Sequence, residues 1–321
     1  KCATMTVAIT PAADADRVLP GIVLMLGFCV FAPMLDVAAK LAAATLPVGQ
    51  ITAARFIVQA VLMLPLCLAM GLGLRLPVRL WGIVTARALL LILSTYLFIA
   101  AIAIMPLADA LAIVFVEPFI ILIFAKLYFG DEVGPRRIGA AAVGFAGVLL
   151  VIQPSFAEFG AVALLPLGTA FSFAAYMLVT RGLSRRMHPV AMQYHTAVVA
   201  SLICIPVIWL ADGRGWATLD PVMPQGVVWL WLGGVGVFAA LSHLMMTYAL
   251  KFAPSATLAP LHYLEIVMAA LLGYLVFQDF PDTLTLIGIS VIIGSGLYVI
   301  HRERVNARAP LVTQSPPAAA I

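Results

Sequence analysis

Long apolar runs dominate the pattern of hydrophobic and polar positions, and short stretches with proline, glycine and charged residues separate them. A helix crosses a bilayer with about 20 mostly apolar residues, whereas strands of a membrane barrel are about ten residues long and alternate in polarity. Because the runs are continuous, they predict an all-α polytopic membrane protein with ten transmembrane helices. The predicted spans are residues 18–39, 48–70, 81–105, 107–129, 138–152, 161–180, 190–210, 226–250, 255–277 and 284–300.

The composition agrees with a chain whose solvent is lipid. Of 321 residues, 64% are hydrophobic and 10% are charged, and the mean hydropathy is +1.12, whereas soluble domains carry about 25% charged residues. This leaves little room for a soluble domain. A net charge of +4 does not indicate a nucleic-acid partner. The four cysteines have no CxxC or Cys/His spacing, so we expect no disulfide framework, no metal site and no cofactor.

The distribution of lysine and arginine predicts which ends of the helices face the cytoplasm. With ten spans both termini lie on one side, and thirteen of the 18 Lys and Arg residues fall on that side. Lys40 and Arg214 fall on the other side, and Arg55, Arg87 and Lys126 lie within spans. The positive-inside rule then places both termini in the cytoplasm. We expect Lys126 to extend towards the nearer interface, and Arg87 to do the same or to reach a central cavity.

An internal repeat divides the chain into two halves, residues 18–152 and 161–300, with cytoplasmic tails at 1–17 and 301–321. Each half has five spans, so the second half enters the membrane from the opposite side and the repeat is inverted. Inverted repeats are typical of transporters that work by alternating access and bind substrate near the midplane between the halves. The matches at an offset of 148 include Pro106 with Pro254, Glu117 with Glu265 and Asp131 with Asp279, and at 141 Lys40 meets Arg181.

Four sequence motifs resemble those of the ten-helix drug/metabolite transporters with two EamA domains, the aromatic amino acid exporters among them. They are Ala-Ala-Arg-Phe at 53–56, Met-Pro-Leu-Ala-Asp-Ala at 105–110, Phe-Gly-Asp-Glu at 129–132, and Gly139 followed by Gly-Phe-Ala-Gly-Val at 144–148. The resemblance extends from Leu19 to about Ile300. It implies export of amino acids or other small metabolites across a bacterial inner membrane. The second half departs from the pattern, because Gln-Asp-Phe at 278–280 replaces the usual acidic closing motif.

Two glutamates, Glu117 and Glu265, lie about ten residues into the fourth and ninth spans and therefore near the midplane of the bilayer. A charge there is costly, so such residues are paired, protonated or in contact with water. We interpret them as a site for a substrate ammonium group or a proton; structural carboxylates are the alternative. His262 is three residues from Glu265 on the same helix face, with Tyr263 beside it and His243 on the eighth span. These histidines either exchange a proton with the glutamate or hydrogen-bond across helices.

The second span carries a deep cation, Arg55, and the first span carries an acidic residue, Asp36, near its external end. We interpret them as a structural or gating pair rather than as a receptor for a substrate carboxylate. Aromatic residues near the middle of the first, third and sixth spans predict an apolar cavity suited to a hydrophobic side chain, although helix packing also uses such residues. Those assigned to substrate binding are Phe31, Tyr96, Phe173 and Tyr176.

These observations together predict an exporter of amino acids, preferably aromatic or hydrophobic ones, that works by alternating access, with protons as a candidate coupling ion. The sequence contains no P-loop, His-Glu-x-x-His or Gly-x-Ser-x-Gly motif, so ATP hydrolysis and enzyme activity are not expected. The alternatives are a transporter of drugs, nucleotide sugars or other metabolites with the same fold, or a channel without alternating access. Small residues such as Ala140 and Gly144 are compatible with a monomer or a weak homodimer.

Overall fold

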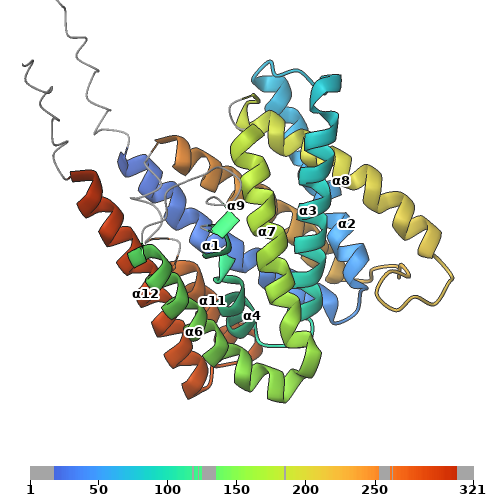
Figure 1. Cartoon of the computed structure of the whole chain (residues 1–321). Coiled ribbons are helices and arrows are strands. Elements are labelled where there is room, and N and C mark those ends of the chain that lie inside the picture. The colour runs from blue at the N-terminus through green and yellow to red at the C-terminus, as the bar shows by residue number, and fades with distance from the viewer. Residues whose placement is uncertain are drawn as a thin grey trace, which may run out of the picture.

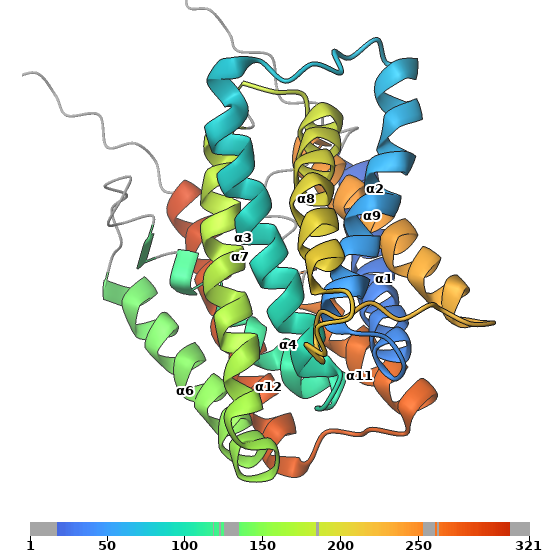
Figure 2. The same ribbon diagram turned by 90° about the vertical axis from the view of Figure 1, so that its right-hand side faces the viewer.

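The computed structural model describes residues 18–117, 119–121, 123–124, 135–183, 186–252, 261 and 263–308. Within these ranges every regular element is a helix, and the helices form a bundle (Figures 1 and 2). They are α1 (Val18–Ala43), α2 (Val48–Ala69), α3 (Val78–Ile102), α4 (Leu107–Val114), α6 (Pro135–Phe159), the short 3-10 helix η2 (Gly160–Leu164), α7 (Leu165–Leu183), α8 (Pro189–Ala211), α9 (Val228–Phe252), α11 (Leu264–Phe277) and α12 (Thr283–Arg308).

Six helical segments are long and apolar enough to cross a membrane. They lie in α1, α2, α3, α8, α9 and a continuous segment, residues 142–180, that joins α6 to α7 through η2; α11 and the first part of α12 are shorter apolar helices. Large apolar side chains on the outside of the bundle, such as Val61, Leu202 and Leu230, are at least 60% exposed. Such a surface is unfavourable in water and ordinary in lipid. The chain is therefore a multi-pass membrane protein.

The boundaries of two helices follow the predicted spans closely, whereas those of α3 and α6 differ from the predicted limits by three to seven residues. Helix α2 ends one residue before the limit of the predicted span 48–70, and α8 extends one residue beyond each limit of the span 190–210. Each run is set by the length of chain needed to cross the hydrocarbon core. The length of these helices is therefore readable from the sequence.

Two predicted spans are not single continuous helices, which corrects the expectation for residues 107–129 and 255–277. Helix α4 ends at Val114, and Phe115 and Val116 form a turn before helical structure resumes at Glu117. The next residue in the sequence is Pro118, which lies outside the described residues; a proline has no N–H to donate to the carbonyl four residues before it, which favours a break. In the ninth span α11 begins only at Leu264, directly after a turn residue.

The helices pack in pairs, and each of the main pairs joins a helix of the first half of the chain to a helix of the second half. The most extensive interfaces join α1 to α9, α6 to α12, α2 to α8 and α3 to α7. Figure 1 shows α6 and α12 side by side at one edge of the bundle, and α3 beside α7 near its middle. Helices α4 and α11 also contact each other. The short α4 and its break therefore lie inside the bundle.

Close packing between α6 and α12 depends on two glycines, Gly147 and Gly288. A Cβ atom added at Gly288 would lie 2.7 Å from the carbonyl oxygen of Gly147, so the two backbones approach too closely for a side chain. Overpacking of this kind costs about 1–3 kcal/mol. We expect Gly288→Ala to lower the melting temperature of the protein in detergent by about 2–6 °C.

The matched control for this prediction is Gly294→Ala on the same helix, because a Cβ atom at Gly294 meets no neighbour within 4 Å. Alanine favours a helix over glycine, so this variant should melt at the same temperature or higher. Equal melting temperatures for the two variants would show that the close contact contributes nothing to stability.

Candidate functional site

A cavity of about 130 Å³ lies inside the bundle, between α1, α2, α3, α4, α7, α9 and α11. Its lining carries three carboxylates, from Asp36, Glu117 and Glu265, together with the guanidinium of Arg55 and the imidazole of His243. The cavity is large enough to hold several water molecules. The lining also contains four residues with hydroxyl groups and four phenylalanines. They are Ser94, Thr95, Thr169 and Ser242, and Phe28, Phe98, Phe115 and Phe173.

The cation of the cavity, Arg55, is held by residues of two neighbouring helices. Its guanidinium donates a hydrogen bond to the hydroxyl of Thr95 on α3, and its Nη2 lies 2.9 Å from Nε2 of His243 on α9. Arginine has donors only. The contact therefore requires His243 Nε2 to accept, which leaves the ring neutral with its proton on Nδ1. Arg55 is thus oriented by an acceptor on each side.

Two donors beside the cavity have no acceptor among the described residues. They are Nε of Arg55 and Nδ1 of His243, both shielded from solvent. A buried donor without a partner costs about 1–3 kcal/mol. Both belong to side chains that line the cavity. An anionic or carbonyl group bound in this cavity could satisfy them.

The predicted pair of Asp36 and Arg55 is brought to one cavity but not into direct contact. Both residues are 5% exposed and line the same wall. No ion pair joins them in the part of the chain that the structure describes, because the guanidinium is turned towards Thr95 and His243. A gating role for these two residues stays a prediction.

Each of the two glutamates that the sequence predicts near the midplane follows one of the helix breaks. Glu117 is the first helical residue after the turn at Phe115 and Val116, and Glu265 lies in the first turn of α11. Both side chains are less than 10% exposed, and both line the cavity. The residues before them also meet, because the rings of Phe115 and Tyr263 are 5.5 Å apart. The start of α11 carries partial positive charge, which stabilises a carboxylate at Glu265.

The other predicted binding residues divide into those at the cavity and those elsewhere. Phe173 lines it, whereas Phe31 stacks on Phe238 with ring centroids 6.1 Å apart. Tyr96 and Tyr263 are not part of the lining, although Tyr263 contacts Phe115, which is. Tyr176 is buried beside Arg87. His262 lies outside the described residues.

The structure corrects the expectation that Arg87 extends to the interface or reaches the cavity. Its side chain is fully buried in a separate polar cluster between α3, α7 and α8. The guanidinium donates to Thr180 at 2.8 Å, to Tyr176 at 2.5 Å and to Thr196. Hydroxyl groups on two other helices accept the hydrogen bonds of the guanidinium inside the bundle. These bonds replace those that water would otherwise make. Lys126 lies outside the described residues.

Several lining residues were not anticipated from the sequence. Ser94 and Thr95 interrupt the apolar run of the third span, and Ser242 directly precedes His243. Polar residues at mid-span are a usable signal for a cavity. The signal does not tell which of them face the cavity, because Ser and Thr also bond to their own helix backbone, as Thr52 does to Val48.

The named relatives of this chain are transporters, and a solved structure shares its fold. A solved crystal structure with 21% sequence identity matches 90% of this chain and 99% of its own with a TM-score of 0.60, which shows the fold alone. A riboflavin transporter of Brucella anthropi is 26% identical over 254 residues, 79% of this chain and 88% of that protein. An S-adenosylmethionine uptake transporter of Rickettsia bellii is 27% identical over 68% of this chain and 72% of that protein.

A further relative is the pseudopaline exporter of Pseudomonas aeruginosa, 28% identical over 78% of this chain and 84% of that protein. The model of the EamA-like transporter family matches residues 19–153 and again residues 160–301. These two matches cover most of the helices described above. The chain therefore belongs to the EamA-like transporter family and is a membrane transporter rather than an enzyme.

Proposed function

We propose that this protein moves a small amino-acid-type metabolite, zwitterionic and with an aromatic or other apolar part, across a bacterial inner membrane by alternating access. The single observation that carries the proposal is the cavity. It combines three carboxylates with two donors, on Arg55 and His243, that have no acceptor among the described residues.

The pattern of helix contacts supports an internal repeat in which residues 18–152 and residues 161–300 are equivalent halves. Exchange of the halves maps α1 onto α7 and α9 onto α3, so the α1–α9 interface corresponds to the α7–α3 interface, and both are extensive. The contacts of α2 with α8, α6 with α12 and α4 with α11 each pair a helix with its own counterpart. Inverted repeats give two equivalent conformations by exchanging the shapes of the halves.

The helix breaks support the same relationship. Phe115 and Glu117 in the first half correspond to Tyr263 and Glu265 in the second at the offset of 148 residues. The first break ends directly before Glu117 and the second ends two residues before Glu265, and both glutamates line the cavity. Discontinuous helices near the midplane are how many secondary transporters build their substrate site.

The arrangement of the chain ends supports an even number of crossings. The first residues of α1 and the last of α12 lie at the same end of the bundle (Figure 1). Together with the excess of Lys and Arg on that side, this supports cytoplasmic termini. The opposite end, where α11 connects to α12, is then the external end (Figure 2).

The chemistry of the cavity supports the substrate class. A substrate ammonium group suits the carboxylates of Asp36, Glu117 and Glu265, and a substrate carboxylate suits the free donors on Arg55 and His243. The phenylalanines of the lining offer flat surfaces for a ring or an aliphatic chain. Phenylalanine, tyrosine, tryptophan and S-adenosylmethionine all combine these three features.

Riboflavin is a second candidate substrate. Relatives of this chain in Brucella anthropi and Vibrio cholerae are named riboflavin transporters, and a planar ring system also suits the aromatic lining. Riboflavin has no ammonium group, however, so it offers no positive charge to the carboxylates of the cavity.

The test is flux into proteoliposomes that contain the purified protein. We expect saturable uptake of labelled aromatic amino acids or S-adenosylmethionine, and faster uptake when the vesicles are preloaded with the same unlabelled compound. Preloading accelerates a carrier with alternating access but not a channel. Vesicles without protein are the control, and a nucleotide sugar and riboflavin complete the panel. The proposed substrate class would be contradicted if riboflavin were the one compound with saturable flux, or if no zwitterion showed saturable flux.

A further inference from the structure

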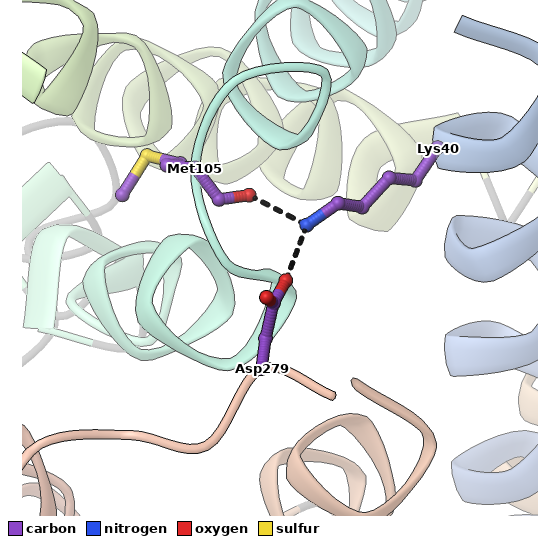
Figure 3. Close-up of polar contacts among 3 residues, drawn as sticks. All are labelled: Lys40, Met105 and Asp279. Atoms are coloured by element: carbon purple, nitrogen blue, oxygen red, sulfur yellow. Dashed lines mark hydrogen bonds and ion pairs between the residues drawn. The ribbon is translucent and has the colours of Figure 1, made fainter. Parts of the chain in front are cut away.

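An ion pair at the predicted external end of the bundle joins segments that are far apart in the sequence. The ammonium of Lys40, in the last turn of α1, lies 2.9 Å from Oδ2 of Asp279, in the connection between α11 and α12. It also donates to the carbonyl oxygen of Met105 at 3.1 Å, between α3 and α4, and lies 4.6 Å from the ring of Phe277. Figure 3 shows the ammonium between the two oxygens.

The pair lies directly beyond the cavity. Ala39 and Asp36 of α1 line the cavity, and Lys40 follows one turn after Asp36, about 6 Å along the helix. Helix α11, which contributes Glu265 to the lining, contacts α1 and leads to Asp279 at its far end. Lys40 therefore joins the ends of two helices that both contribute residues to the cavity wall.

The environment of the pair fits a contact that opens and closes. The side chain of Lys40 is 14% exposed and that of Asp279 is 34% exposed, so one flank of the pair faces away from the bundle interior. A partly exposed ion pair is weak enough to break and reform repeatedly. The same charges recur in the sequence repeat, where Arg181 corresponds to Lys40 and Asp131 to Asp279.

We propose that Lys40 and Asp279 form a gate that closes the external end of the cavity, and that this contact breaks whenever α1 and α11 separate to admit or release substrate on that side. The gate rests on the proposed alternating-access function. Met105 and Phe277 hold the lysine in place when the gate is closed.

The experiment measures how fast a cysteine in the cavity reacts with a charged thiol reagent that does not cross membranes. Ser94, which lines the cavity, is replaced by cysteine after Cys2, Cys29, Cys67 and Cys204 are replaced by alanine. We expect Asp279→Asn to raise the labelling rate from the Lys40 end about fivefold or more, because the closed population falls. The double variant Lys40→Asp with Asp279→Lys should return the rate to that of the parent protein.

Asp282→Asn is the matched control, because it removes a carboxylate from the same connection. Asp282 accepts a hydrogen bond from the backbone N–H of Thr285 at 2.7 Å and makes no ion pair with Lys40. The cavity cysteine of the Asp282→Asn variant should therefore be labelled at the rate of the parent protein. Right-side-out and inside-out vesicles identify the end that opens. If Asp279→Asn fails to fold, Lys40→Met provides the same measurement. An unchanged rate, an equal rise in the control, or no recovery in the double variant would overturn the gate.

Labelling needs no substrate, so failure of the gate and failure of the proposed function can be told apart. A saturable, preloading-accelerated flux together with unchanged labelling rejects the gate and leaves the transport function standing. Increased labelling in Asp279→Asn with recovery in the double variant supports the gate, whichever compound in the flux panel is carried.

Discussion

Arg55→Ala is expected to lower the initial rate of saturable substrate uptake about tenfold or more, since a hydrogen bond to a charged group contributes about 1.5–3 kcal/mol. Among the described residues that line the cavity, Arg55 is the one lysine or arginine. Removing it deprives a substrate carboxylate of its counter-charge. It also leaves Thr95 and His243 without their contact to the guanidinium. The measurement is flux into proteoliposomes over a range of substrate concentrations.

The control for this prediction is Arg79→Ala, which removes an exposed arginine near the start of α3 and should leave the flux unchanged. Arg55→Lys separates charge from geometry, because lysine keeps the charge but loses the planar fork that serves two partners at once. We expect this variant to retain an intermediate rate. Wild-type flux in Arg55→Ala, at equal protein incorporation, would exclude the arginine from substrate binding.

Glu265→Gln is expected to lower the same flux about tenfold or more, because it replaces a buried carboxyl group of the cavity with an uncharged amide of nearly the same size. Glu265 is 7% exposed and lies in the first turn of α11. If protons drive transport through this carboxyl group, the dependence of the rate on external pH should also become flat. The measurement is uptake at several external pH values with the internal pH held constant.

Glu158→Gln is the matched control, since Glu158 is an exposed glutamate on α6 outside the cavity lining. Glu117→Gln tests whether the glutamate of the first half acts in the same way. Loss of flux with an unchanged pH profile would assign Glu265 to substrate binding alone. If both the rate and its pH profile matched the parent protein, proton coupling through Glu265 would be excluded.

The sequence alone was sufficient to identify a helical membrane protein and the limits of several helices. An apolar run records the thickness of the surrounding hydrocarbon, which is the same along the whole chain. The limits of α2 and α8 were therefore predicted to within one residue of those observed. The prediction that Glu117 and Glu265 lie near the midplane uses the same counting, since depth depends on distance along the helix. The number of lysines and arginines in each connecting loop predicts which side of the membrane the loop faces, and this rule also needs no knowledge of tertiary contacts.

Only the tertiary structure decided which polar side chains meet. Arg55 turns to Thr95 and His243 rather than to Asp36, Arg87 is enclosed by hydroxyls of α7 and α8, and Lys40 reaches Asp279 over a separation of 239 residues. Such contacts depend on the rotation of each helix about its axis and on its register with neighbours. Both are set by side-chain packing over the whole bundle. An apolar run fixes the depth of a residue in the membrane, but it carries no information about the helix that the residue will face.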